Sequence, residues 1–143
     1  MDIKTTWGPP TTAVSITGVG LLDKAIDFGG QPVPSAVNTD DCLIFVVPSV
    51  SVGSYEISVG GQSVGNFEVA YPKSAPVINY VVSGVDNWYA VGGDQFYVGE
   101  TIINVDGVDY PSYVISPQEC AFVYTGVLNA FKLTTSLGVA TYP

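Results

Sequence analysis

Few residues in this chain could carry out chemistry, because its 143 residues include no His and no Arg. Without His, acid–base catalysis near neutral pH would fall to a carboxylate pair, a Lys or a Cys. A glycosidase-type pair needs two acids facing one cleft, whereas the acids here lie mostly in or beside turn sequences such as Asp86-Asn87 and Gly99-Glu100. A Cys nucleophile would lack its His partner. We therefore expect no catalytic residues and a protein that is not an enzyme.

The two cysteines, Cys42 and Cys120, are candidates for a disulfide or for buried thiols. The internal repeat described below places them at equivalent positions of two domains. Such positions are on the order of tens of ångströms apart in tandem domains, beyond the roughly 7 Å Cα separation that a disulfide allows. Each cysteine follows an acidic residue and begins an apolar stretch, as a small buried hydrophobe would. We expect two buried free thiols, which agrees with a reducing compartment.

The stretch Asn104-Val105-Asp106-Gly107-Val108-Asp109 resembles part of a calcium loop with alternating oxygen ligands. It lacks the bidentate Glu that closes such a loop. Asp106-Gly107 between two valines is also a strong hairpin signal, because both residues tolerate a positive φ. The pattern favours a turn over a metal site, and we expect neither a metal nor a cofactor.

Aromatic residues are the best candidates for a contact surface. Trp7 lies in an N-terminal arm flanked by Pro and Gly, and Trp88 and Tyr89 lie shortly before Gly92-Gly93. Aromatic anchors dominate protein interfaces, where charged residues are depleted. The alternative is ordinary core packing between two sheets. We take Trp7, Trp88 and Tyr89 as candidate interface residues, with the core alternative left open.

The charge balance excludes several classes of partner. Four Lys and thirteen acidic residues give a net charge of −9. Nucleic-acid binding requires clustered cations, and anionic membrane surfaces would also repel the chain. No apolar run approaches the roughly 20 residues of a membrane span, and the N-terminus lacks the apolar segment of a signal peptide. If Met1 is the native start, we expect a protein that is made and left in the cytoplasm, whereas a mature fragment cut from a longer precursor would look the same.

Short apolar segments between Gly and Pro predict an all-β fold. Residues 12–17 and 54–59 alternate between apolar and polar side chains, and residues 64–71 do so loosely. Residues 43–47 form a continuous apolar run stopped by Pro48, as expected of a buried strand. No stretch shows helical spacing over ten or more residues, so little or no helix is expected.

An internal repeat divides the chain into two halves. The segment Ile26-Asp27-Phe28-Gly29-Gly30 answers to Ile103-Asn104-Val105-Asp106-Gly107, and each half closes on Tyr-Pro. Five such correspondences occur in the same order, which indicates a duplicated domain. We place the domains at residues 1–72 and 73–143, joined by a short, Pro-bounded linker. Short strands separated by Gly/Pro turns favour a sandwich in each half.

The pattern within each half resembles the IPT/TIG immunoglobulin-like domain family. In the second half, Pro76-Val77-Ile78 opens the first strand and Gly92-Gly93 supplies the Gly-Gly turn. Phe96-Tyr97-Val98-Gly99 ends a strand in Gly, and residues 102–107 run into the Gly-rich hairpin. The first half carries Val14-Ser15-Ile16-Thr17-Gly18 and the hairpin at residues 26–30. The resemblance implies two tandem immunoglobulin-like β-sandwiches, a fold that also occurs in adhesins, receptor ectodomains, carbohydrate-enzyme accessory domains and phage virion proteins.

The function expected from these features is structural. Low charge, many aromatic residues, free cysteines and no catalytic apparatus are typical of a protein that sits in a larger assembly. Our leading hypothesis is a bacteriophage virion protein, preferably a capsid decoration or cement protein bound to the major capsid protein, with a tail or fibre component as a variant. The alternative is a carbohydrate-binding or adhesive module of a bacterial surface protein. Self-association into a homo-oligomer is left open.

Overall fold

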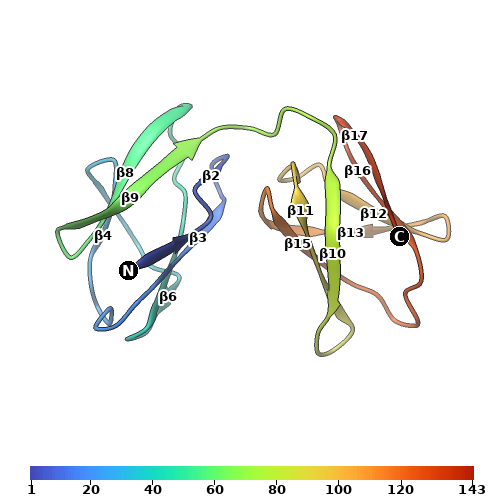
Figure 1. The fold of residues 1–143 in the computed structure, drawn as a ribbon, viewed down its shortest axis with the longest axis horizontal. Coiled ribbons are helices and arrows are strands. Elements are labelled where there is room, and N and C mark those ends of the chain that lie inside the picture. The colour runs from blue at the N-terminus through green and yellow to red at the C-terminus, as the bar shows by residue number, and fades with distance from the viewer. The chain divides into compact units, whose positions relative to one another are not determined.

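The computed structural model describes all residues 1–143 and contains strands and turns but no helix (Figure 1). It therefore holds no helix long and apolar enough to cross a membrane. The strands fall into two compact units, Met1–Ala70 and Tyr71–Pro143. The boundary lies two residues before the one expected from the sequence. The prediction of an all-β, immunoglobulin-like fold is confirmed.

The first unit is a sandwich of a four-stranded and a five-stranded sheet. The four-stranded sheet has the order β1 (Asp2–Lys4), β3 (Ala13–Thr17), β7 (Cys42–Val46) and β6 (Val37–Asn38). The five-stranded sheet has the order β2 (Trp7–Gly8), β9 (Gln62–Val69), β8 (Gly53–Val59), β4 (Ile26–Phe28) and β5 (Gln31–Val33). All neighbouring strands are antiparallel except β2, which runs parallel to β9.

Alternation along these strands fills the core of the first unit. Successive side chains of a strand point to opposite faces, so Val14 and Ile16 of β3 are buried while their neighbours are not. Phe28 lies at the centre, with its ring centroid 5.9 Å from those of Phe45 and Phe67. Edge-to-face and tilted pairs of this kind add about 0.5–1.5 kcal/mol each beyond the burial of their area.

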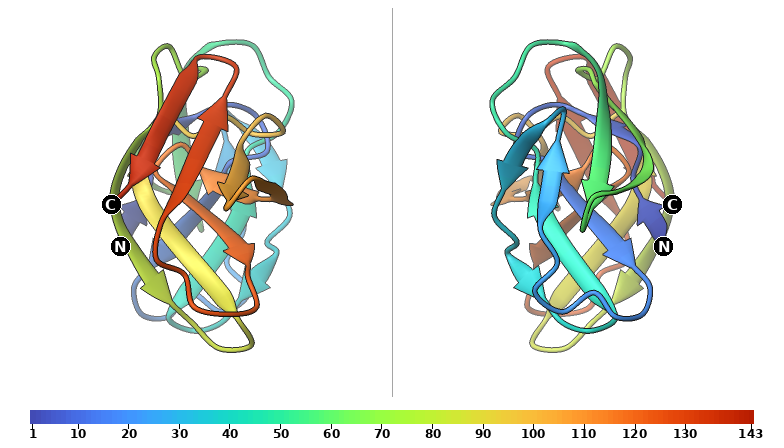
Figure 2. Two further views of the ribbon diagram at one scale, coloured as in Figure 1. Left: turned by 90° about the vertical axis from the view of Figure 1, so that its right-hand side faces the viewer. Right: turned by 90° about the vertical axis from the view of Figure 1, so that its left-hand side faces the viewer.

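The second unit repeats the arrangement with two four-stranded sheets, and the left view of Figure 2 faces this unit with the red hairpin β16–β17 in front. One sheet has the order β10 (Val77–Ser83), β11 (Trp88–Asp94), β15 (Glu119–Val123) and β14 (Tyr113–Ser116). The other has the order β13 (Val108–Pro111), β12 (Ile102–Val105), β16 (Phe131–Thr135) and β17 (Gly138–Tyr142). All neighbouring strands in both sheets are antiparallel.

Phe122 lies in the centre of the second core. It is fully buried, and its ring centroid lies 5.6 Å from that of Tyr89 and 5.4 Å from that of Phe131. The remaining buried hydrophobic residues of this core are Val91, Phe96, Ile103, Val105, Cys120 and Leu133. Each unit thus has its own hydrophobic cluster, as expected of a duplicated domain.

Both predicted glycine hairpins are present. Gly29 and Gly30 connect β4 to β5 with φ of 58° and 84°, and Asp106 and Gly107 connect β12 to β13 with φ of 51° and 84°. Two successive residues with positive φ are the mark of a turn whose twist matches the flanking strands. The interpretation of Asp106-Gly107 as a turn is therefore confirmed.

Gly92-Gly93 does not form the turn that the family resemblance implied. Both residues lie within β11, near its C-terminal end, and both are buried. A Cβ on Gly93 would lie 1.8 Å from the backbone oxygen of Val77, so this position needs Gly because β10 approaches β11 closely. The pair marks a close approach of backbones rather than a change of chain direction.

The two cysteines are free. The sequence repeat had indicated that they are structurally equivalent, and this expectation is wrong. Cys42 pairs with Thr17 at the start of β7 and is half-buried, whereas Cys120 is the second residue of β15 and is fully buried. The ladders differ by one residue from the sequence alignment. A shift of one residue turns a side chain to the opposite face of a strand, so only Cys120 is a core thiol.

Candidate functional site

The outward face of the sheet β10-β11-β15-β14 is largely apolar although it is exposed, with the half-buried Glu119 of β15 as an acidic residue beside Gly92. Strand register places Val82, Ala90, Ala121 and Tyr113 in one row across the four strands. Tyr80 precedes this row on β10, and Trp88 and Val123 pair on its other side. We call the side chains of this face the aromatic face: Tyr80, Val82, Trp88, Ala90, Tyr113, Ala121 and Val123. Tyr80 and Tyr113 are 56% and 58% exposed, which is unusual for such large rings on one surface.

Tyr80 lies over the strand beside it. Its partner across the ladder is Gly92, and a Cβ on that glycine would meet the Tyr80 ring at 2.1 Å. The ring therefore covers backbone that a side chain would otherwise cover, an arrangement that compensates for glycine in a sheet. Gly92 is buried for this reason although its position faces outward.

Trp88 and Tyr113 meet at the other side of the face. Their ring centroids lie 5.5 Å apart with an interplanar angle of 55°. Trp88 is 39% exposed, so the pair is available for contact while its members stabilise one another. The sequence analysis named Trp88 but not Tyr80, Val82 or Val123. The signal was present in β10, where apolar residues occupy outward as well as inward positions.

Tyr89 does not share this face with Trp88, although the sequence analysis took both as candidate interface residues. Adjacent residues of a strand point to opposite sides, and Tyr89 packs against the core, stacked on Phe122 at 21°. Trp7 is half-buried in β2 of the first unit, where it pairs with Glu68 of β9. Of the three candidate interface residues, Trp88 alone belongs to the aromatic face.

The equivalent face of the first unit is largely polar along the corresponding two strands. Its sheet β1-β3-β7-β6 is built by the same pairings, with Asp2 opposite Thr17 and Lys4 opposite Ser15. By their positions in the ladders, Asp2 corresponds to Tyr80 and Thr17 corresponds to Gly92. In the same way, Lys4 corresponds to Val82 and Ser15 corresponds to Ala90. The fold therefore does not require the aromatic residues of the second unit.

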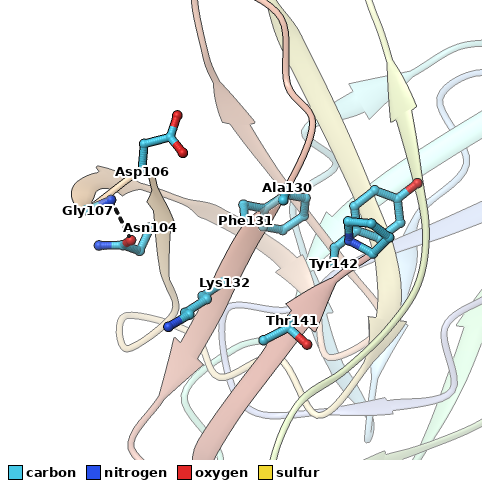
Figure 3. Close-up of a pocket in the computed structure, with 9 residues that line it drawn as sticks. Asn104, Asp106, Gly107, Ala130, Phe131, Lys132, Thr141 and Tyr142 are labelled. Atoms are coloured by element: carbon cyan, nitrogen blue, oxygen red, sulfur yellow. Dashed lines mark hydrogen bonds between the residues drawn. The ribbon is translucent and has the colours of Figure 1, made fainter.

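A second candidate site is an open depression of about 440 Å³ at one end of the sheet β13-β12-β16-β17 (Figure 3). The polar residues of its lining include Asn104, Asp106, Lys132 and Thr141, and Tyr142 contributes an aromatic ring. Register places Asn104, Lys132 and Thr141 in one row across β12, β16 and β17. The depression contains one carboxylate side chain and one ammonium group, which is suited to binding rather than to paired-carboxylate catalysis.

No group of three or more Cys, Asp or Glu residues lies close enough together to hold a metal ion. The side chain of Asn104 is engaged in the turn, since its Oδ1 accepts a hydrogen bond from the Gly107 amide at 3.1 Å and its Nδ2 donates to Asp109 at 2.8 Å. Burial, and secondarily the Glu119 carboxylate, raises the pKa of the Cys120 thiol to about 12. A thiol held protonated in the core is not a nucleophile.

Comparison with known protein families gives a match for the first half of the chain. Residues 1–75 match the IPT/TIG domain family, which is just over half of the chain. The chain belongs to the IPT/TIG family. The matched range corresponds to the first unit, and the second unit of this IPT/TIG protein repeats the same strand pairing. No curated protein matches the sequence significantly.

Solved structures with a similar arrangement are parts of much longer proteins. The full extracellular region of plexin A4 is 18% identical with a TM-score of 0.42, over 97% of this chain and 15% of that one. The Bacteroides ovatus SGBP-B protein, solved with a mixed-linkage heptasaccharide, is 15% identical with a TM-score of 0.45, over 93% and 38%. The BSP domain of a biofilm-associated protein is 18% identical with a TM-score of 0.41, over 97% and 27%. The chain thus spans well under half the length of each.

Proposed function

We propose that this IPT/TIG protein is a non-catalytic docking module of a larger assembly, and that the aromatic face is its docking surface. The observation that carries the proposal is the contrast between the two units. Equivalent positions hold Asp2, Lys4 and Thr17 in the first unit but apolar residues in the second. Exposed aromatic residues that the fold does not need are costly for solubility and are typical of interfaces.

A protein surface is the partner that the geometry favours. A flat platform for sugar rings would require coplanar aromatic residues, whereas Trp88 and Tyr113 are tilted by 55°. A tilted pair gives an uneven apolar surface that fits protruding side chains of a folded partner. The absence of Lys and Arg from the four strands of this sheet agrees with a partner other than nucleic acid.

Within this class, we propose a structural protein of a bacteriophage virion, made in the host cytoplasm and bound to the major capsid protein as a decoration or cement protein. Small size, tandem immunoglobulin-like units, low charge and an apolar docking surface support this choice. A tail or fibre protein would use the same surface on a different partner. The adhesive or carbohydrate-binding alternative is supported by the fold and not by the shape of the aromatic face.

The experiment is a binding assay on phage shells prepared without this protein. Purified chain is added back and cosedimentation is measured for the wild type, for Trp88→Ala and for Tyr113→Ala. Buried aromatic anchors contribute at least about 2 kcal/mol, so each variant should bind at least about thirtyfold more weakly. Tyr71→Ala is the matched control, because Tyr71 is exposed outside the aromatic face. Equal binding of all variants would refute the aromatic face as the docking surface, and no binding of the wild type would remove the decoration role.

A further inference from the structure

The depression in Figure 3 lies beside the hairpin β12–β13, and the corresponding hairpin of the first unit is covered by an aromatic ring. In the first unit, Tyr55 stacks on Phe28 with ring centroids 5.1 Å apart. The ring also lies against Gly29, where a Cβ would be 2.6 Å from Tyr55 Cδ1. Its hydroxyl donates to the carbonyl oxygen of Ser51 at 2.7 Å, which fixes the ring in place.

Strand register identifies the corresponding residues of the second unit. The equivalent ladder pairs are Asp27–Ser58 in the first unit and Asn104–Lys132 in the second. Three residues before Ser58 lies Tyr55, and three residues before Lys132 lies the exposed Asn129. Tyr55 is a ladder residue of β8, whereas Asn129 lies before the start of β16 and does not line the depression. The difference that the ladders do show lies at the hairpin, where Asp106 holds the place of Gly29, so a Cβ is present where the Tyr55 ring lies against the turn in the first unit.

Three polar side chains of the depression have no hydrogen-bond partner within the chain. The side chains of Asp106, Lys132 and Thr141 make no hydrogen bond or ion pair, whereas the neighbouring Asn104 is held by two hydrogen bonds. Figure 3 shows Lys132 extending on the same side as Asn104, with Asp106 on the turn above it. A carboxylate, an ammonium group and a hydroxyl thus remain available to a ligand, on a framework that is already ordered.

An aromatic ring lies at the other end of the same depression. Tyr142 packs on the buried Phe131 with ring centroids 5.5 Å apart and an interplanar angle of 32°, which supports the Tyr142 ring from behind. One positive and one negative side chain balance each other, so a ligand with a net charge would gain one interaction and lose the other. A neutral ligand with several hydroxyl groups can use both as charge-assisted hydrogen-bond partners.

We propose that this depression binds a neutral saccharide of one or two rings. Hydroxyl groups of the sugar contact Asp106, Lys132 and Thr141, and an apolar face of the ring packs on Tyr142. The volume of about 440 Å³ lies within the range of ligand sites in proteins. This site lies on the other sheet from the aromatic face and goes beyond the docking function proposed above.

The test is a titration of the full chain with glucose, N-acetylglucosamine, cellobiose and chitobiose, followed by amide chemical shifts. We expect saturable shifts at Gly107, Lys132 and Thr141 with dissociation constants in the millimolar range. Glucuronate and glucosamine, which carry opposite charges, serve as comparisons and should bind more weakly than their neutral counterparts.

Two variants separate the site from other surfaces. Lys132→Met removes the ammonium group of the depression and should weaken binding at least tenfold. Lys73→Met removes a lysine outside the depression and should bind like the wild type.

Three results would overturn the proposal. The first is no saturable shift with any neutral sugar up to about 50 mM, well above the millimolar range expected. The second is unchanged binding by Lys132→Met, and the third is tighter binding of a charged sugar. Trp88→Ala should retain full saccharide binding, so failure at this site is distinguishable from failure of the aromatic face.

Discussion

The adjacent glycines of β11 should respond very differently to substitution by alanine. Neither Gly92 nor Gly93 has a positive φ, so alanine is compatible with the backbone at both positions. Reduced freedom of the unfolded chain then stabilises each variant by about 0.4–1 kcal/mol. The difference between them comes from what the new Cβ would meet in the folded state.

At Gly93, the Cβ meets the backbone oxygen of Val77 at 1.8 Å and Phe96 Cζ at 2.8 Å. A backbone atom within a sheet cannot move without lengthening ladder hydrogen bonds, and overpacking of this kind costs about 1–3 kcal/mol or more. We expect Gly93→Ala to be less stable by about 2 kcal/mol. At Gly92, the Cβ meets only the far end of the Tyr80 ring, which can swing towards solvent. We expect Gly92→Ala to change stability by less than about 0.5 kcal/mol, because the lost ring contact and the entropic gain nearly cancel.

Urea unfolding followed by Trp fluorescence measures both effects, with Trp7→Phe as the background so that Trp88 reports on the second unit. A unit of about 70 residues has a stability of roughly 4–11 kcal/mol, so a loss of about 2 kcal/mol is measurable while the unit stays folded. Equal stabilities of the two alanine variants would refute this account of the close approach between β10 and β11. So would a Gly92→Ala variant that is the less stable of the two.

Further predictions concern the thiols and the second hairpin. Native protein at pH 8 should react with iodoacetamide at Cys42 and not at Cys120, with both modified after denaturation, as counted by mass spectrometry. The pKa of Cys120 is raised from 9.0 to about 12. The contribution of this thiol to stability is therefore present below pH 9 and is lost as the pH rises from 9 towards 12. Cys120→Ala should flatten that part of the profile of stability against pH relative to the wild type. Asn104→Ala removes the hydrogen bonds to Gly107 and Asp109 and should destabilise the second unit by about 0.5–1.5 kcal/mol in urea unfolding, whereas Asn104→Asp, which retains the acceptor for Gly107, should lose less.

Local patterns of the sequence predicted the strands and hairpins well. The expected strand at residues 43–47 is β7, Cys42–Val46, and the one at residues 54–59 lies within β8, Gly53–Val59. These segments alternate or are continuously apolar and end at Gly or Pro, so each carries its own signal. The two hairpins followed from residues that tolerate a positive φ.

Features that depend on pairing between strands were not predictable in the same way. Gly92-Gly93 looked like a turn because the sequence does not show that β10 lies against β11. Cys42 and Cys120 aligned in the repeat, but a one-residue shift in register put them on opposite faces. The aromatic face combines residues from four strands that are far apart along the chain, and only the ladder brings Trp88 next to Tyr113. Strand alternation could have shown that Trp88 and Tyr89 point to opposite sides.

The polar outward residues of β1 and β3 have a consequence for handling the second unit. Asp2, Lys4 and Thr17 face outward where the second unit has Tyr80, Val82 and Gly92. A duplicated domain can hold an adhesive surface in one copy while the other copy keeps the chain dispersed before assembly. Grafting the first-unit residues onto β10, as Tyr80→Asp with Val82→Lys, would extend that property to the second unit and give a non-docking protein with the same fold.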